Sequence, residues 1–79
     1  MKPYMTIRNY NEKEIGIAFR IVGDLIEFNH SYREENSWRP SVCDMDEIER
    51  RYNIPEHFEV VWYTEEEYKA MLIMRELIS

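Results

Sequence analysis

Cysteine and glycine are scarce in this sequence. It contains one cysteine, Cys43, and two glycines, Gly16 and Gly23, among 79 residues. A single cysteine excludes an intrachain disulfide and is typical of proteins from a reducing compartment, so we expect a cytoplasmic protein. Two separated glycines cannot form a Gly-rich loop, which excludes a phosphate-binding backbone cradle of that kind.

Long apolar segments are also missing. No uninterrupted apolar run approaches the roughly 20 residues that a membrane-spanning helix requires. The first residues, Met1-Lys2-Pro3-Tyr4, lack the apolar core of a signal peptide. With 44% apolar and 33% charged residues, the composition is that of a globular chain. We therefore expect one domain over residues 1–79, with no membrane contact and modest stability.

Basic residues are too few to balance the acids in the second half of the chain. Residues 1–33 carry five Lys/Arg and four Asp/Glu, whereas residues 34–79 carry five Lys/Arg and twelve Asp/Glu. The formal net charge of −6 therefore comes from the second half. Such a field repels nucleic acid and attracts basic surfaces. We expect no direct nucleic-acid binding, and we expect a protein partner with a basic surface.

Residues 15–32 fit two secondary structures. As a helix, the segment places its apolar residues on one broad face. As a hairpin, it turns at Gly23-Asp24, and the register pairs Phe19 with Phe28 and Arg20 with Glu27. Five β-branched residues between positions 15 and 26 and two glycines favour the hairpin, because both disfavour a helix. We predict the hairpin and keep the helix as the alternative.

Shorter patterns predict the remaining elements. Met5 to Tyr10 is typical of a strand, and Phe58 to Tyr63 is nearly continuous in apolar character, which favours a strand buried inside the sheet. Asp44 followed by Glu47 is a capping-box pattern that begins a helix, which ends near Pro55.

The last helix begins at Thr64. Glu67 completes a second capping-box pattern, and three glutamates occupy the first turn, where the helix dipole favours negative charge. Its expected inner stripe is Met71, Met74, Leu77 and Ile78. The sequence thus predicts an α+β fold: a small two-layer domain in β-β-β-α-β-α order, with an antiparallel hairpin at Gly23-Asp24 and two helices packed on the sheet.

Residues for catalysis or metal binding are not arranged in any recognisable pattern. The soft metal-ligand types are His30, Cys43 and His57, and no two have a ligand spacing. The paired carboxylates lie in polar helix starts, where their pKa values are lowered instead of raised for acid–base work. We therefore expect no catalytic, cofactor-binding or metal-binding residues, no cofactor, and no enzymatic activity.

The segment from Tyr32 to Pro40 has the composition of a protein contact. Trp, Tyr and Arg are enriched among interface hot spots, and Trp38 lies in a polar stretch where it need not be core. The alternative is that Trp38 folds back as a lid on the sheet. The expected partner-binding residues are Tyr32, Glu34, Glu35, Trp38 and Arg39 in this segment, and Glu65 and Glu66 in the last helix.

Two functions from different classes fit these features. The first is a small acidic protein-binding module, an inhibitor or decoy that mimics nucleic acid and docks its acidic half on a nucleic-acid-handling protein. Inhibitors of this type are typical of phages and other mobile elements, so such a source is expected. The second is a structural or self-associating subunit, such as a homodimer, that uses the C-terminal helix or a sheet edge. A rigid acidic surface would favour the decoy, and a contiguous apolar patch would favour the self-associating subunit.

Overall fold

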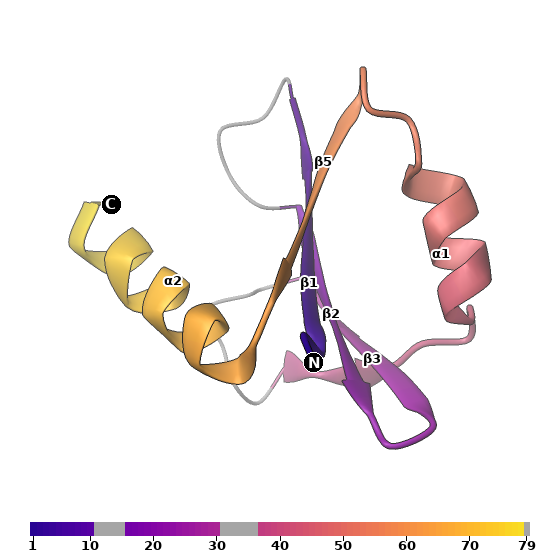
Figure 1. The fold of residues 1–79 in the computed structure, drawn as a ribbon, viewed down its shortest axis with the longest axis horizontal. Helices are drawn as coiled ribbons and strands as arrows, with labels where there is room; N and C mark the ends of the chain where they lie inside the picture. Colours follow the sequence, from indigo (N-terminus) through magenta and orange to yellow (C-terminus); the bar gives the residue numbers. More distant parts are fainter. Residues whose placement is uncertain (11–15, 31–36, 79) are drawn as a thin grey trace.

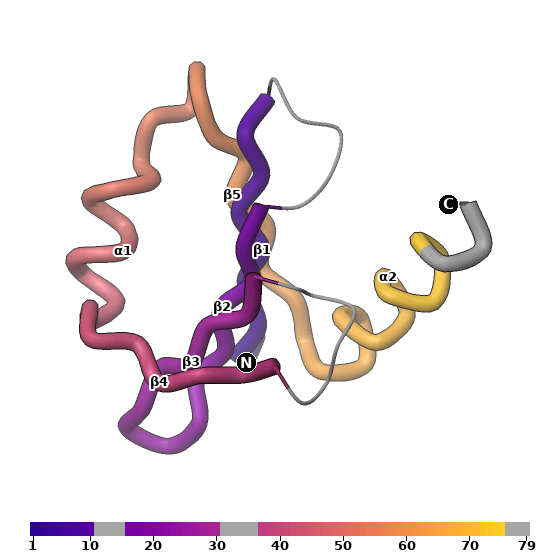
Figure 2. Tube along the Cα trace, turned by 180° about the vertical axis from the view of Figure 1, so that it is seen from behind, coloured from indigo at the N-terminus to yellow at the C-terminus, as the bar shows by residue number. Residues whose placement is uncertain are grey.

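A five-stranded antiparallel sheet with one helix on each face forms the core of the protein (Figures 1 and 2). The computed structural model describes residues 1–10, 16–30 and 37–78. The strand order is β4-β3-β2-β1-β5. Along the chain the elements are β1 (Tyr4–Asn9), β2 (Ile17–Val22), β3 (Leu25–Asn29), β4 (Arg39–Pro40), α1 (Met45–Tyr52), β5 (Phe58–Tyr63) and α2 (Glu65–Ile78). The α+β class and the expected order are confirmed, with β4 as an additional two-residue strand.

The hairpin between β2 and β3 has the predicted register. Phe19 pairs with Phe28 and Arg20 with Glu27, and the Arg20 Nε donates to Glu27 Oε1 over 2.7 Å. Gly23 has a φ of 61°, and no other described residue has a positive φ. This is the pattern of a type II′ turn, whose first central position favours glycine. The helical alternative for this segment is wrong, because cross-strand pairing of β2 with both β1 and β3 outweighs the broad apolar face of a helix.

Strand β5 lies at the edge of the sheet, not inside it. It pairs with β1 alone among the described strands, from Tyr4 with Tyr63 to Asn9 with Phe58. The expectation of a buried central strand is therefore wrong, and Val60 is 39% exposed. Strand β5 is apolar along its length because a helix packs on each face of the sheet, so side chains on both faces of this strand are partly buried. Its outer edge pairs with no described strand.

Both helices begin at the capping residues that the sequence indicates. The Asp44 side chain accepts a hydrogen bond from the Glu47 backbone N–H over 2.9 Å at the start of α1. At the start of α2, the Glu67 N–H donates to Thr64 Oγ1 over 3.1 Å and the Thr64 N–H donates to Glu67 Oε1 over 3.0 Å. This reciprocal capping box satisfies two backbone donors that a helix start leaves unpaired.

The helices lie on opposite faces of the sheet, so the fold has three layers and not the expected two (Figure 1). Successive strand residues point to opposite faces, and here both faces are apolar and need a cover. On the α1 face, the buried cluster is Met5, Ile7, Phe19 and Ile48. On the α2 face, Ala18 and Tyr68 are buried, with Tyr4, Trp38, Tyr63, Met71 and Leu72 packed against them.

Helix α2 contacts the sheet mainly through its first half. Tyr68 is buried and Met71 half-buried, whereas Met74 is 60% exposed and Ile73 59% exposed. In Figure 1 the C-terminal half of α2 extends away from the sheet. The expected inner stripe is therefore wrong at Met74, and its members Leu77 and Ile78 lie outside the described side chains.

Candidate protein-interaction surfaces

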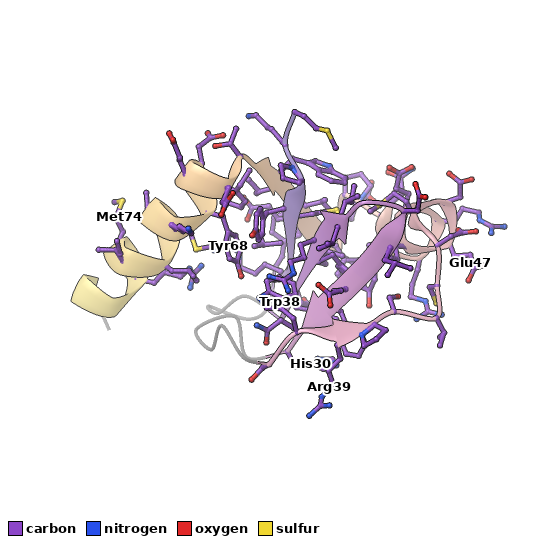
Figure 3. The ribbon with its side chains drawn as sticks, turned by 90° about the horizontal axis from the view of Figure 1, so that it is seen from below. His30, Trp38, Arg39, Glu47, Tyr68 and Met74 are labelled. Carbon is purple, nitrogen blue, oxygen red and sulfur yellow. The ribbon has the colours of Figure 1, made fainter. Side chains whose placement is uncertain are left out.

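The contact segment expected from the sequence is only partly described. Tyr32, Glu34 and Glu35 lie outside the described residues, so their part in a contact stays a prediction. Trp38 and Arg39 follow, immediately before and within β4. Their side chains take different directions in Figure 3, where Trp38 points toward the body of the protein and Arg39 away from it.

Trp38 packs on the α2 face of the sheet as part of an aromatic cluster. Its ring meets Tyr4 edge-on, with centroids 6.0 Å apart, and lies 6.2 Å from the Tyr68 ring. Tyr4 and Tyr68 stack on each other at 4.5 Å and 17°. Trp38 is half-buried, which is the arrangement of the lid considered as the alternative to an exposed anchor.

Arg20 contacts both this aromatic cluster and Glu27 of the β2–β3 hairpin. Its guanidinium carbon lies 4.4 Å from the centroid of the Trp38 ring, a cation–π distance. Burial lowers the pKa of Arg20, but the hydrogen bonds and charges of Glu27 and Tyr4 together outweigh burial, and the net shift is upward. Arg20 is therefore a cation that contacts the Trp38 ring and forms an ion pair with Glu27.

The expected contact residues do not gather in one place. Glu65 and Glu66 are exposed in the first turn of α2, on the face of the sheet that Trp38 covers. Glu65 pairs with Lys69 over 3.2 Å, one helical turn away. Arg39 is exposed on β4, at the edge of the sheet farthest from β5.

Three separate segments with acidic residues lie at one end of the protein, two of them on opposite sides of the sheet. The turn of the β2–β3 hairpin, the first turn of α1 and the first turn of α2 all lie at the lower end in Figures 1 and 2. We call this the acidic end, and its residues are Asp24, Asp44, Asp46, Glu47, Glu65, Glu66 and Glu67. The acids of the second half of the chain thus share an end, although they lie on both faces of the sheet.

The acidic end has more negative charge than its surroundings neutralise. Lys2 lies 3.8 Å from Glu67, Lys69 pairs with Glu65, and the N-terminus and β4, which carries Arg39, lie at the same end in Figure 2, but Asp24, Asp46 and Glu66 form no ion pair within the described part of the chain. Each helix start supplies only about half a positive charge. Two or more carboxylates in each first turn exceed that charge, so the field at this end stays negative.

Capping hydrogen bonds fix the positions of two of these carboxylates, Asp44 and Glu67. Glu67 is held by Thr64, and the hydrogen bond from the Thr64 backbone N–H is the main cause that lowers the pKa of Glu67. Asp44 is held by the Glu47 N–H. A surface whose charges are held in place before binding loses less conformational entropy when a partner docks.

Shallow apolar grooves flank α1 on its face of the sheet. One, of about 270 Å³, is lined by Met5, Ile7, Ile48, Glu49, Tyr52, Asn53, Val60 and Trp62. The other, of about 240 Å³, lies over β2 and β3 and includes His30 and Cys43. The spacing of His30 and Cys43 in the sequence did not predict that they would line the same groove. No hydrogen bond joins their side chains in the part of the chain that the structure describes, so a thiolate–imidazole pair is not formed there.

Within residues 1–10, 16–30 and 37–78, no group of three or more His, Cys, Asp or Glu side chains is arranged to hold a metal ion. No helix in those ranges is long and apolar enough to cross a membrane. No protein-family model matches the chain, and neither a curated protein nor a solved structure matches it. Function must therefore be argued from the surfaces themselves.

Sequence reasoning missed two features of these surfaces. Local patterns identify each acidic turn, but only the topology aligns the hairpin turn with both helix starts. Likewise, the apolar character of β5 gives no sign that the strand lies at an edge. A strand covered on both faces and a central strand have the same sequence pattern.

Proposed function

We propose that this protein is a small binding module that docks its acidic end on a basic surface of a protein that handles nucleic acid, and so blocks that surface as an inhibitor or decoy. The observation that supports this function most directly is the gathering of Asp24, the α1 first turn and the α2 first turn at one end. A surface with several carboxylates, two of them held by capping hydrogen bonds, presents negative charge as a phosphate backbone does, and basic proteins bind such charge.

Charge is distributed unevenly between the two ends of the molecule. The last turn of α1, with Arg51, lies at the end opposite to the acidic turns, whereas the Arg50 side chain folds back and its Nε donates to the Asp46 carbonyl over 3.4 Å. A basic partner is therefore attracted to one end and not to the whole surface. Such steering acts mainly on the association rate and weakens as salt shortens the range of the field to less than about 10 Å.

Charge reversal at the acidic end tests this function. The partner is first isolated from the natural host by affinity purification, and its binding kinetics are then measured with an Asp46→Lys/Glu66→Lys variant. The association rate should fall about tenfold, because both carboxylates are exposed and neither has an ion pair in the described structure. Adding the wild-type protein should also release nucleic acid from the partner.

A matched control reverses the same number of charges elsewhere. Glu49→Lys/Glu56→Lys changes the net charge equally, but both residues are exposed outside the acidic end. This variant should retain most of the association rate. If both variants slow association equally, or if neither does, the acidic end is not the docking surface.

Self-association through α2 is the second candidate function. Ile73 and Met74 are 59% and 60% exposed on the half of α2 that extends away from the sheet. Figure 3 places Met74 on the side of α2 remote from Tyr68. An Ile73→Glu/Met74→Glu variant should abolish any oligomer formed this way, as measured by light scattering after size-exclusion chromatography, without unfolding the domain.

A further inference from the structure

The two edges of the sheet differ in how they are protected. The β4 edge is two residues long and consists of Arg39 and Pro40, a short edge with a charge and a proline, which prevents pairing with other strands. The β5 edge is six residues long and contains no Lys, Arg or Pro. Its one charged residue, Glu59, is neutralised by an ion pair with Arg8 of β1. An unprotected edge of this kind is a template for another strand.

The backbone of β5 offers its hydrogen-bonding groups at alternate residues. The Tyr10 N–H donates to the His57 carbonyl over 3.1 Å, and in an antiparallel pair the bonded residues alternate along the strand. Residues 59, 61 and 63 therefore bond to β1, and residues 58, 60 and 62 direct their backbone groups outward. The Phe58 N–H is already bonded to the Ile54 carbonyl over 2.9 Å. The groups left for a new strand are the Phe58 carbonyl and both groups of Val60 and Trp62.

An apolar groove adjoins this edge. Helix α1 has eight residues and contacts β5 at Phe58, whose ring meets Tyr52 edge-on with centroids 5.1 Å apart, but it leaves a groove beside Val60 and Trp62. The resulting groove of about 270 Å³ has Met5 and Ile7 in its floor and Val60 and Trp62 at its outer side. Phe58 and Trp62 pack against the α1 cluster but are only partly buried, and Val60 is 39% exposed. A strand added at β5 would cover this apolar surface.

We propose that the occupant is a second copy of this chain, whose β5 pairs antiparallel with β5 across a two-fold axis at Val60. In this register each Val60 N–H donates to the Val60 carbonyl of the other copy, and each Trp62 N–H donates to the Phe58 carbonyl of the other copy. The two sheets become one continuous sheet, and the grooves beside the two α1 helices merge into one apolar channel.

The side chains of β5 are self-complementary in this register. On the α1 face, Phe58 lies opposite Trp62 of the second copy and Val60 lies opposite Val60, which are favourable cross-strand pairs. On the other face, Glu59 lies opposite Val61, so no like charges face each other. A register shifted to pair Glu59 with itself would oppose two carboxylates, which disfavours it.

The charge distribution also favours a second copy in antiparallel orientation. The acidic end lies at the Tyr63 end of β5, where α2 begins, and the last turn of α1, with Arg51, lies toward the Phe58 end. The two-fold axis therefore places the acidic ends at opposite ends of the dimer. A parallel arrangement would bring the acidic ends together, and their repulsion would oppose association. Both acidic ends stay accessible in the antiparallel dimer, so this inference does not depend on the proposed function.

Measurement of mass against concentration tests the dimer. Sedimentation equilibrium from about 10 µM to about 1 mM should show a reversible monomer–dimer equilibrium, because an edge-strand interface is smaller than that of a stable dimer. Val60→Lys should raise the dimer dissociation constant at least about tenfold, since it places two ammonium groups opposite each other at the axis. Val42→Lys is the matched control, because Val42 is fully exposed in the loop before α1, and it should leave the dissociation constant unchanged.

A disulfide test locates the axis directly. Bonded residues in an antiparallel pair have Cα atoms about 5.5 Å apart, within the roughly 4.4–6.8 Å that a disulfide spans. In a Cys43→Ser background, Val60→Cys should oxidise to a covalent dimer about tenfold faster than Val42→Cys, because pairing raises the effective thiol concentration.

Three results would overturn the inference. The first is a monomer at every concentration with equal oxidation rates for the two cysteine variants. The second is a dimer that survives Val60→Lys but is lost in Ile73→Glu/Met74→Glu, which would assign the interface to α2. The third is a chain that is monomeric alone and binds an extended segment of another protein at β5.

Discussion

The two faces of the sheet are covered in different ways. On the α1 face, four side chains from β1, β2 and α1 form the buried cluster, Met5, Ile7, Phe19 and Ile48, and grooves remain on both sides of the helix. On the α2 face, the cover is mainly aromatic: Tyr68 and Trp38 lie over Tyr4 and Ala18, and Arg20 lies against the Trp38 ring. The α2 face also carries the Arg8–Glu59 ion pair beside Arg75.

A chain of this length thus covers the two faces of one sheet with different numbers of buried side chains. The α1 face shares its burial among four cluster residues, of which α1, with eight residues, provides one, Ile48, whereas the α2 face has two, Ala18 and Tyr68. Aromatic rings each bury a large area, so Tyr68 and Trp38 cover the α2 face with few residues. The α2 face should therefore depend more strongly on single side chains than the α1 face does.

The largest effect is expected at Tyr68. Tyr68→Ala removes the ring that stacks on Tyr4 and contacts Trp38 and Tyr63, and should lower the free energy of unfolding by about 4 kcal/mol. Tyr68→Phe keeps the ring and should lose much less. Urea denaturation followed by tryptophan fluorescence measures both variants. If Tyr68→Ala lowers the free energy of unfolding no more than Ile48→Ala does, the α2 face does not depend more strongly on single side chains than the α1 face.

A smaller loss is expected at Ile48 on the α1 face. Ile48 is 3% exposed and packs with Met5, Ile7 and Phe19. Ile48→Ala should lower the free energy of unfolding by about 3 kcal/mol, and the conservative Ile48→Val by about 1 kcal/mol. The same urea titrations give both values. If the two substitutions cost the same, the cavity left at this position has closed by movement of α1 toward the groove.

Trp38 and Arg20 should be energetically coupled. Trp38→Ala should lower the free energy of unfolding by about 2 kcal/mol, because the half-buried ring contacts Tyr4 and Tyr68. A double-mutant cycle with Arg20→Met should give a coupling of about 0.5–1 kcal/mol from the cation–π contact. A coupling near zero would mean that Arg20 acts through Glu27 alone. A Trp38→Ala variant that keeps full stability but loses a partner would instead restore the role of an exposed anchor.

The smallest effect is a pH dependence at the start of α2. The folded protein lowers the pKa of Glu67 below its ordinary value of 4.5, mainly through the hydrogen bond from the Thr64 N–H. A lowered carboxylate pKa stabilises the fold above the unfolded pKa, and that contribution is lost as pH falls through the folded pKa. The difference in melting temperature between wild type and Glu67→Gln should therefore shrink below about pH 4.5. Thermal scans by circular dichroism at pH 7 and at lower pH measure it.

Local sequence patterns determined the elements that depend on neighbouring residues. The turn at Gly23-Asp24 and the pairing of Phe19 with Phe28 follow from a glycine that accepts a positive φ and from side chains that alternate about it. The helix starts at Asp44 and Thr64 follow from capping groups that reach backbone N–H groups three residues away. These interactions span a few residues, so the sequence contains all that they require.

Only the tertiary structure decided which surfaces these elements form. Whether a helix covers one face or the other, whether β5 is central or at an edge, and whether Trp38 is a lid or an anchor all depend on contacts between distant residues. The candidate site was predictable as a set of acidic turns but not as one end of the molecule. Side-chain alternation and capping are fixed by local backbone geometry, whereas the position of each element is fixed by the burial of apolar faces that separate segments supply together.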